Sequence, residues 1–237
     1  MQLNGKTALL TGCSSGLGKA LTMALIDKGV KVYGLARNLE KLEELKKQTG
    51  ELFEAVHLDI TDFEETKNWI STVFSENHSP DILINNAGIG EFRKIEETTL
   101  EDWIQIQNVN LNAVFYLTSK LVPWMKSKEQ SSHIINIGSI LGSVGRAEGT
   151  AYCASKFGIQ GFSDALFKEL RDFNIKVSCV NPGSIATDFF KTSGIQSHSN
   201  MLHPKDLADS IIHLLETPDN FLISEITIRP LQPTLKQ

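Results

Sequence analysis

The sequence predicts an α/β protein built on one doubly wound parallel sheet, with about seven strands and helices on both faces. Short apolar runs rich in β-branched residues alternate with longer amphipathic stretches along the whole chain, which is the pattern of a parallel sheet covered by helices. The 237 residues suffice for a substantial core, and no linker, repeat or low-complexity segment divides them. We therefore expect a single domain over residues 1–237.

The first half of the chain shows this alternation clearly. Its strands are expected near 6–11, 30–35, 52–58 and 81–85, and its helices near 16–28, 39–48 and 62–76. The first strand is the apolar run Thr7–Leu10, which leads through a glycine-rich turn into the first helix. The helix near 62–76 begins with a capping signal, either Thr61 with Glu64 or Asp62 with Glu65.

The second half continues the pattern with longer helices. Its strands are expected near 132–138, 175–181 and 222–229, and its helices near 100–127, 150–172 and 204–216. Pro204 suits the first turn of the last helix, because a helix needs no backbone N–H there. The segment of about 187–203 lacks periodicity and is rich in Ser, Thr, Gly and Asn, so we expect a loop.

Composition excludes several classes of protein. The net charge of −5 argues against broad binding of nucleic acid, which needs a basic face. No apolar run approaches the ~20 residues of a membrane helix, and no signal peptide is recognisable. The three cysteines have no paired spacing, which suits the cytoplasm, and the scattered histidines predict no metal site. Cys13 and Cys153 are interpreted as packing residues, with a thiol-sensitive site as the alternative.

Tyr152 and Lys156 lie four residues apart in a predicted helix, so their side chains would share one face. A tyrosine ionises near pH ~10 and is a poor acid or base at neutral pH. A lysine charge about 5–6 Å away, at an effective dielectric constant of ~20, would lower the phenol pKa by roughly two units. The pair therefore indicates an acid/base tyrosine, although the same spacing also occurs on ordinary surface helices.

A second signal is the glycine-rich turn between the first strand and the first helix. Such a turn presents backbone N–H groups and the positive end of a helix to a phosphate. Gly12 would permit the turn, Gly16 the close approach of a ligand, and Gly18 close packing of the helix on the sheet. The turn predicts a nucleotide site, and a glycine turn without a ligand is the alternative.

Together these and further motifs resemble the short-chain dehydrogenase/reductase family. The matching segments, in family order, are Thr11-Gly12-Cys13-Ser14-Ser15-Gly16-Leu17-Gly18, Asn85-Asn86-Ala87-Gly88, Asn110, Ser139, Tyr152 with Lys156, and Pro182-Gly183. The resemblance runs from about residue 5 to residue 188. It implies a Rossmann-type fold, a nicotinamide cofactor and hydride transfer to or from a carbonyl or alcohol. It also implies that the segment of about 187–203 closes over the substrate.

The resemblance assigns catalysis to Tyr152, Lys156, Ser139 and Asn110. Tyr152 would give or take the proton at the substrate oxygen, and Ser139 would hold that oxygen. Lys156 would stabilise the tyrosinate and hydrogen-bond the nicotinamide ribose. Asn110 would order a water molecule that relays protons toward Lys156. All four positions are filled, which argues against an inactive relative.

The end of the second strand bears on the choice between NAD(H) and NADP(H). Where an NAD-preferring site has a carboxylate for the ribose hydroxyls, this chain has Ala36 followed by Arg37. A guanidinium favours a 2′-phosphate, so we expect NADP(H), unless Arg37 is only a solvated loop cation. The residues implied to bind the cofactor are Gly12, Ser14, Ser15, Gly16, Leu17, Gly18, Arg37, Asp59, Ile60, Asn86, Ala87, Gly88, Tyr152, Lys156, Pro182, Gly183, Ile185 and Thr187.

The expected function is that of an NADP(H)-dependent carbonyl reductase or alcohol dehydrogenase acting on a small molecule. One alternative is a 3-oxoacyl-carrier-protein reductase, which would need basic surface near the site to meet an acidic carrier. Lys191, Lys205 and Arg146 offer little of it. An alternative from a different class is a protein that senses NADP(H) without turnover.

The sequence also predicts the lining of a substrate pocket and the surface through which copies of the chain would associate. The substrate pocket would be lined by residues 141–144, residues near 90–92, and Phe189 with Phe190. The two phenylalanines suggest an apolar or aromatic substrate, or they anchor the loop to the core. Family members pair through the helices that correspond to 100–127 and 150–172, so a homodimer or homotetramer is expected.

Overall fold

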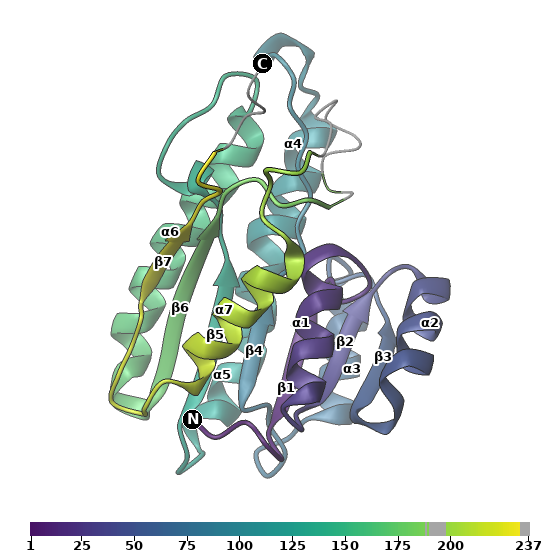
Figure 1. Ribbon diagram of the computed structural model, residues 1–237, viewed down its shortest axis with the longest axis vertical. Helices are drawn as coiled ribbons and strands as arrows, with labels where there is room; N and C mark the ends of the chain where they lie inside the picture. Colours follow the sequence, from purple (N-terminus) through teal and green to yellow (C-terminus); the bar gives the residue numbers. More distant parts are fainter. Residues whose placement is uncertain (188, 190–197, 233–237) are drawn as a thin grey trace.

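Seven parallel strands form one twisted sheet in the computed structural model, which describes residues 1–187, 189 and 198–232 (Figure 1). The sheet order is β3-β2-β1-β4-β5-β6-β7, and every neighbouring pair is parallel. The strands are β1 (Thr7–Thr11), β2 (Lys31–Ala36), β3 (Phe53–His57), β4 (Ile82–Asn85), β5 (Ser132–Ile137), β6 (Ile175–Pro182) and β7 (Glu225–Ile228). The predicted fold class is confirmed.

Helices cover both faces of the sheet. The helices α1 (Gly16–Asp27), α2 (Leu39–Thr49) and α7 (Pro204–Glu216) share one hydrophobic core with the sheet. The helices α3 (Phe63–Val73), α5 (Ala113–Lys126) and α6 (Thr150–Leu170) share the other, and α4 (Leu100–Gln107) precedes α5. In Figure 1, α1 and α7 lie side by side in front of the sheet, and α6 lies behind it.

The central strands are buried on both faces, as parallel sheets require. Leu9 of β1, Leu83 of β4 and Ile134 of β5 are completely inaccessible to solvent. Burying each such side chain contributes about 1.5–3 kcal/mol, so these strands form the most stable part of the molecule. Their carboxyl ends are therefore fixed positions from which loops can present functional groups.

The strand order reverses between β1 and β4. From β1 the chain builds outward through β2 and β3, then returns to place β4 on the other side of β1. The loops that leave β1 and β4 diverge at this point, and a crevice opens beyond the carboxyl ends of the two strands. In open α/β sheets this crevice is the ordinary ligand site.

The boundaries of some elements differ from the prediction. Asp62, not Thr61, caps α3, since its carboxylate accepts a hydrogen bond from the Glu65 backbone N–H at 2.9 Å. The helix predicted over 100–127 is interrupted by one π-helical turn, Asn108–Asn112, between α4 and α5. Amphipathic periodicity does not reveal an inserted wide turn, because the apolar stripe resumes after it. In the described part of the chain, no helix is long and apolar enough to cross a membrane.

Candidate active site

A cavity of about 710 Å³ occupies the crevice at the carboxyl ends of β1, β4, β5 and β6. All of the residues that the sequence predicted for the cofactor line it, from Gly12 to Thr187. Of the predicted catalytic residues, Ser139, Tyr152 and Lys156 line it as well, while Asn110 does not. The structure thus brings together motifs that are far apart in the chain.

The glycine turn after β1 forms the floor of one end of the cavity. Gly12 and Gly16 have positive φ angles of 68° and 51°, which other residues adopt only with strain. A Cβ atom on Gly18 would lie 1.9 Å from the Gly12 carbonyl oxygen, so only glycine lets α1 approach β1 this closely. From the β4 loop, the Asn86 amide donates to the carbonyl oxygens of Thr11 and Gly12 at 2.9 and 3.1 Å. The turn is therefore held rigid by β4.

The first turn of α1 suits an anionic group. Ser15 occupies the N-cap position, but its side chain makes no capping hydrogen bond, and the first turn contains no acidic residue. The backbone N–H groups of a first helical turn lack partners within the helix and carry the positive end of its dipole. Because Ser14, Ser15, Gly16 and Leu17 all line the cavity, the residues present fit the pyrophosphate of a dinucleotide.

The opposite wall of this end comes from β2 and the loop after β3. The Arg37 guanidinium lies 3.6 Å from the Asp59 carboxylate, and these side chains are 60% and 40% exposed. Burial alone would raise the pKa of Asp59, but hydrogen bonds from Thr61 and the charge of Arg37 hold that pKa below its ordinary value. Asn38 and Lys41, at the start of α2, also line the cavity. Two cations thus face the region where the adenosine ribose would lie.

The predicted catalytic pair lies at the other end of the cavity, on the first turns of α6. The Lys156 Nζ atom donates a hydrogen bond to the Ile137 carbonyl oxygen at 2.8 Å and lies 5.7 Å from the centre of the Tyr152 ring. The Ser139 hydroxyl accepts from the Leu141 backbone N–H at 3.1 Å and lies within hydrogen-bonding reach of the phenol. The end of β5 and the start of α6 therefore present a hydroxyl, a phenol and an amine together.

Burial controls the ionisation of this pair. Desolvation raises the pKa of Tyr152 to about 12, and the Ser139 hydroxyl offsets only part of that rise. Desolvation likewise lowers the pKa of Lys156 to about 8. The expected lowering of the tyrosine pKa by lysine was wrong, because it weighed the lysine charge without the cost of removing both groups from water. At neutral pH the phenol is protonated and the amine is charged.

Asn110 lies behind the cavity wall, in the π-helical turn. Its carbonyl oxygen accepts from the Ile89 backbone N–H at 2.8 Å, and its amide donates to the Ile89 carbonyl oxygen at 2.9 Å and the Ser155 hydroxyl at 3.0 Å. The wide turn is what directs this buried side chain toward the β4 loop. Asn110 thus joins the β4 loop to the helix that carries Tyr152.

Aromatic rings surround Tyr152 where a substrate would enter. The Phe92 and Phe189 rings lie 5.6 and 6.0 Å from the Tyr152 ring, measured between centres. Leu141 also lines the cavity, but the predicted lining residues Gly142, Ser143 and Val144 do not. They follow Leu141 in and beyond a short 3₁₀ turn, which directs Ser143 and Val144 to solvent. Phe190 and most of the predicted loop of 187–203 lie outside the described residues.

Asn38, Lys41 and Arg146 are among the cavity residues that the sequence reasoning for this site missed. Asn38 and Lys41 stand at the N-cap and in the first turn of α2, where the position after β2 could have indicated them. Arg146 was considered only as a surface cation, yet it lines the cavity. Its guanidinium carbon lies 4.5 Å above the Phe92 ring. No local sequence pattern marks such a residue, because its place depends on how two distant loops pack.

Comparison with known proteins agrees with this geometry. The family model described as short chain dehydrogenase matches residues 6–197. A 3-oxoacyl-[acyl-carrier-protein] reductase of Haemophilus influenzae is 34% identical over 221 residues, covering 90% of this chain and 91% of the relative. The structure of a 3-ketoacyl-(acyl-carrier-protein) reductase from Brucella melitensis with NADH matches with a TM-score of 0.88 and 27% identity, covering 98% of this chain and all of that one. A metagenomic short-chain oxidoreductase with NADP matches with a TM-score of 0.84 and 31% identity over the full length of both chains.

The fold, the glycine turn and the family match define the class of the protein as a nicotinamide-dependent oxidoreductase of carbonyl and hydroxyl groups. Within that class, the chain belongs to the short-chain dehydrogenase family.

Proposed function

We propose that the protein is an NADP(H)-dependent carbonyl reductase of small molecules, with Tyr152 as the general acid in reduction and the base in oxidation. The observation that carries the proposal is a single cavity with a phosphate-binding glycine turn at one end and Ser139, Tyr152 and Lys156 at the other. A bound nicotinamide supplies or accepts the hydride. The chain's own residues then have to orient the carbonyl and move one proton.

Each catalytic side chain has a role that its position supports. The Ser139 hydroxyl holds the carbonyl oxygen, and Tyr152 delivers the proton to it as negative charge develops. The phenol pKa of about 12 keeps that proton in place at neutral pH, which favours reduction. The charged Lys156 stabilises the tyrosinate left behind. Asn110 acts by fixing the β4 loop against α6, and its proposed water relay is an addition to that contact.

The preference for NADP(H) rests on charge at the adenosine end. Arg37 and Lys41 face the place of the 2′-phosphate, and α2 begins there with its positive dipole end. Asp59 already pairs with Arg37, so the guanidinium would have to serve two anions. Since both side chains are substantially exposed, the ion pair is weak and can be exchanged for a phosphate contact.

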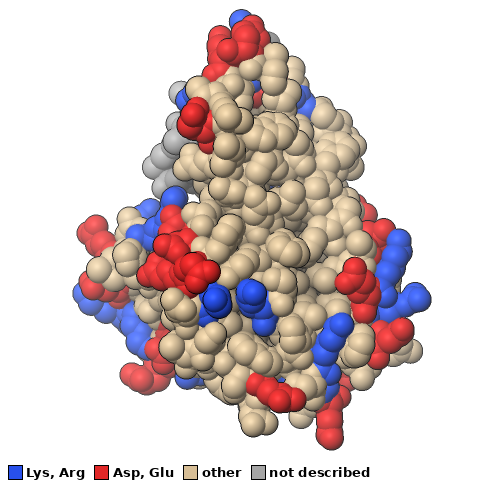
Figure 2. Space-filling model, turned by 180° about the vertical axis from the view of Figure 1, so that it is seen from behind, with Lys and Arg blue, Asp and Glu red and all other residues tan. Residues whose placement is uncertain are grey.

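The second candidate is a 3-oxoacyl-carrier-protein reductase, which the names of several relatives favour. An acidic carrier protein would have to approach the rim of the cavity near Tyr152. The two segments that carry Phe92 and Arg146 also carry the acidic residues Glu91, Glu96, Glu97, Glu101 and Glu148. Figure 2 shows acidic side chains at this tip of the molecule, with some basic side chains beside them. The excess of acidic over basic side chains on these segments disfavours docking of a broad acidic protein surface, so we place free small molecules first.

The proposed function is tested by NADPH oxidation with a panel of aldehydes, ketones, diketones and a 3-oxoacyl thioester, with NADH in parallel. Tyr152→Phe should lower kcat by about 10²–10⁴-fold while NADPH binding, followed by its fluorescence, is unchanged. Retained turnover in that variant would refute the role of Tyr152. A wild-type protein that binds NADPH but turns over nothing in the panel would instead support the alternative of an NADP(H) sensor.

A further inference from the structure

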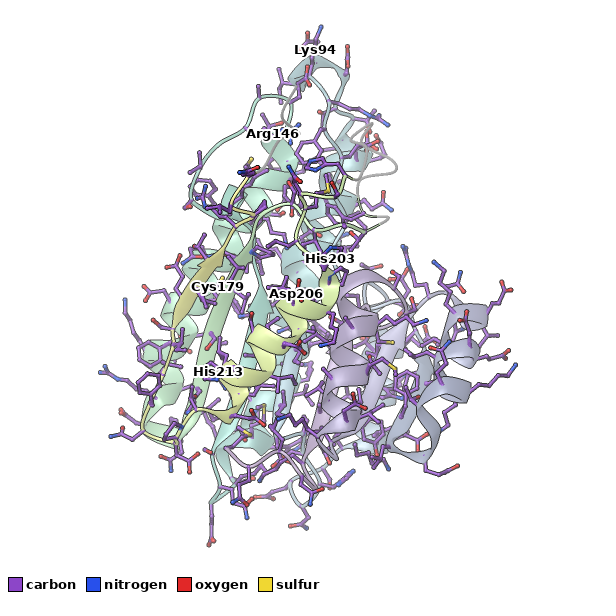
Figure 3. The ribbon with its side chains drawn as sticks, viewed as in Figure 1. Lys94, Arg146, Cys179, His203, Asp206 and His213 are labelled. Carbon is purple, nitrogen blue, oxygen red and sulfur yellow. The ribbon has the colours of Figure 1, made fainter. Side chains whose placement is uncertain are left out.

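Arg146 lines the substrate end of the cavity, and an apolar or aromatic substrate does not explain a guanidinium there. The walls around Tyr152 are the rings of Phe92 and Phe189 together with Leu141. A purely apolar ligand would gain nothing from a guanidinium at this wall. Figure 3 shows Arg146 in the upper part of the molecule, between Lys94 at the tip and His203 at the start of α7.

The Arg146 side chain lies against the Phe92 ring, and no hydrogen bond or ion pair engages its donors within the part of the chain that the structure describes. Its guanidinium carbon lies over the Phe92 ring, 4.5 Å from the ring centre. A guanidinium over an aromatic face can keep its in-plane N–H donors available for a second partner. Among the described residues, Arg146 forms no ion pair with a carboxylate. Its neighbour Arg93, by contrast, pairs with both Glu91 and Asp102.

The backbone that carries Arg146 is fixed. Glu148, two residues on, has a φ angle of 63°, a left-handed conformation that costs energy for a residue other than glycine. The turn is closed by a hydrogen bond from the Gly149 N–H to the Arg146 carbonyl oxygen at 3.2 Å. It is tied to the neighbouring segment by a bond from the Arg93 N–H to the Glu148 carbonyl oxygen at 2.7 Å. A Cβ atom on Gly149 would lie 3.2 Å from the Phe92 ring, so glycine permits this packing.

We infer that Arg146 determines substrate specificity by binding a free carboxylate. The substrate class is then that of small oxo acids, and of hydroxy acids in the reverse direction. A planar carboxylate matches the fork of guanidinium donors and would form a charge-assisted pair. The carbonyl would lie at Tyr152, and the carboxylate a few carbon atoms away, beyond the Phe92 ring. The inference deepens the proposed reductase function and rests on it.

Matched acids and esters test the inference. We would measure kcat/KM with NADPH for 4-oxopentanoate, 5-oxohexanoate and their methyl esters, in the wild type, Arg146→Gln, Arg146→Lys and Arg93→Gln. In Arg146→Gln the ratio of kcat/KM for acid over ester should fall about 10- to 100-fold, as expected for a lost charge-assisted hydrogen bond. Arg146→Lys should restore part of that ratio. Arg93→Gln, which removes a neighbouring arginine already paired with carboxylates, should leave the ratio unchanged.

Other outcomes separate this inference from the proposed function. An unchanged ratio in Arg146→Gln, with turnover intact, would overturn the role of Arg146 and leave the reductase standing. If Arg146→Gln instead lowers kcat/KM selectively for a 3-oxoacyl coenzyme A thioester, Arg146 binds a phosphate of that substrate. This result would overturn the inference that the substrates are free acids. If neither these probes nor the panel of aldehydes, ketones and diketones is turned over, the reductase fails, and quenching of bound NADPH fluorescence by 4-oxopentanoate still decides the role of Arg146. Weaker quenching in Arg146→Gln than in Arg93→Gln would support the carboxylate site, and equal quenching would refute it.

Discussion

Arg37 stands at the mouth of the cavity with an exposed guanidinium and one carboxylate neighbour. If it binds the 2′-phosphate, Arg37→Ala removes a charge-assisted contact worth about 1.5–3 kcal/mol. The KM for NADPH should then rise about 10- to 100-fold, while the KM for NADH changes less than about threefold. Arg171→Ala is the matched control, because Arg171 is equally exposed and lies on the segment after α6, outside the cavity. An equal rise of KM for NADPH and for NADH would show that Arg37 does not bind the 2′-phosphate.

The proposed role of Lys156 predicts a pH limit on the reaction. Because burial lowers its pKa to about 8, the amine loses its charge as the pH rises through that value. A neutral amine cannot stabilise the tyrosinate, so kcat/KM for NADPH, which reports the free enzyme, should fall above pH about 8. This fall in kcat/KM would be measured by steady-state assays from pH 6.5 to 9.5. Circular dichroism over the same range would show that the fold is intact. A constant value up to pH 9.5 would contradict the lowered pKa.

At the level of single residues, the sequence predicted which residues line the cavity better than it predicted their ionisation. The residues predicted to bind the cofactor, and Ser139, Tyr152 and Lys156, lie at one cavity because each follows a strand end or a helical spacing. The direction of the Tyr152 pKa shift could not, since it depends on how completely the fold removes the phenol from water. Arg146 was noted in the sequence, but its place in the cavity was not predicted. A contact between a cation and an aromatic ring on two different loops produces no periodic pattern in the sequence.

Among the structural elements, α1 depends on Gly18, the third residue of the helix. A Cβ atom at Gly18 would meet the Gly12 carbonyl oxygen at 1.9 Å, so Gly18→Ala must push α1 off the turn. We expect a loss of about 1–3 kcal/mol in the free energy of unfolding, together with weakened NADPH binding. Gly161→Ala in α6 is the matched control, since nothing lies within 4 Å of its Cβ position.

The control variant is expected to change the stability in the opposite direction. Alanine in an exposed helix interior is better than glycine by about 0.5–1 kcal/mol, so Gly161→Ala should stabilise the protein and leave NADPH binding intact. Urea unfolding followed by circular dichroism measures both variants. If Gly18→Ala unfolds at the same urea concentration as the wild type, the close approach of α1 to β1 is not limiting.

The π-helical turn is a part of the secondary structure that the sequence did not predict. Helix α4, the turn and α5 read in the sequence as one amphipathic stretch over 100–127. The interruption has a tertiary cause, because the Asn110 side chain hydrogen-bonds Ile89 and Ser155, which lie on two other elements. The strands were more predictable, because the central ones are buried on both faces and their apolar runs are continuous.

The whole molecule leaves one broad uncharged face exposed. Figure 2, seen from behind the view of Figure 1, shows charged side chains at its margins and tip and few over its centre. Large apolar side chains are exposed on α4, α5 and α6, among them Ile104 at 46%, Phe115 at 57% and Phe157 at 47%. Patches of this kind mark interfaces, so we expect a homodimer or homotetramer that buries these helices.

Light scattering after size-exclusion chromatography tests that assembly. Phe115→Glu should shift the mass toward that of the 26.3 kDa monomer, because a charge would be buried without a partner. Phe221→Glu is the control, since Phe221 is similarly exposed at 54% but lies outside these helices. A wild-type protein that is monomeric across the micromolar range would refute the expectation.

Acid stability of the whole fold should depend on one buried histidine. His133 of β5 is inaccessible to solvent, with its Nε2 2.9 Å from the Ser178 hydroxyl and no partner for Nδ1 among the described residues. Burial, helped by the charge of Lys176, lowers the pKa of His133 to about 3 from 6.5. Between those two values the unfolded chain binds a proton that the folded protein does not. Stability is therefore complete above pH 6.5 and falls with decreasing pH by up to about 1.4 kcal/mol per unit.

His133→Gln isolates this contribution, because glutamine does not titrate. The free energy of unfolding, measured by urea titration between pH 4.5 and 6.5, should depend less steeply on pH in the variant, by up to one proton. The comparison uses the slope, so it holds even if the variant is less stable at pH 7. The carboxylates with lowered pKa values, Asp59, Asp81 and Asp102, lose their contribution at lower pH and are common to both proteins. Equal slopes would mean that His133 is protonated in the folded protein, with water or a rearranged Ser178 reaching the centre of the sheet.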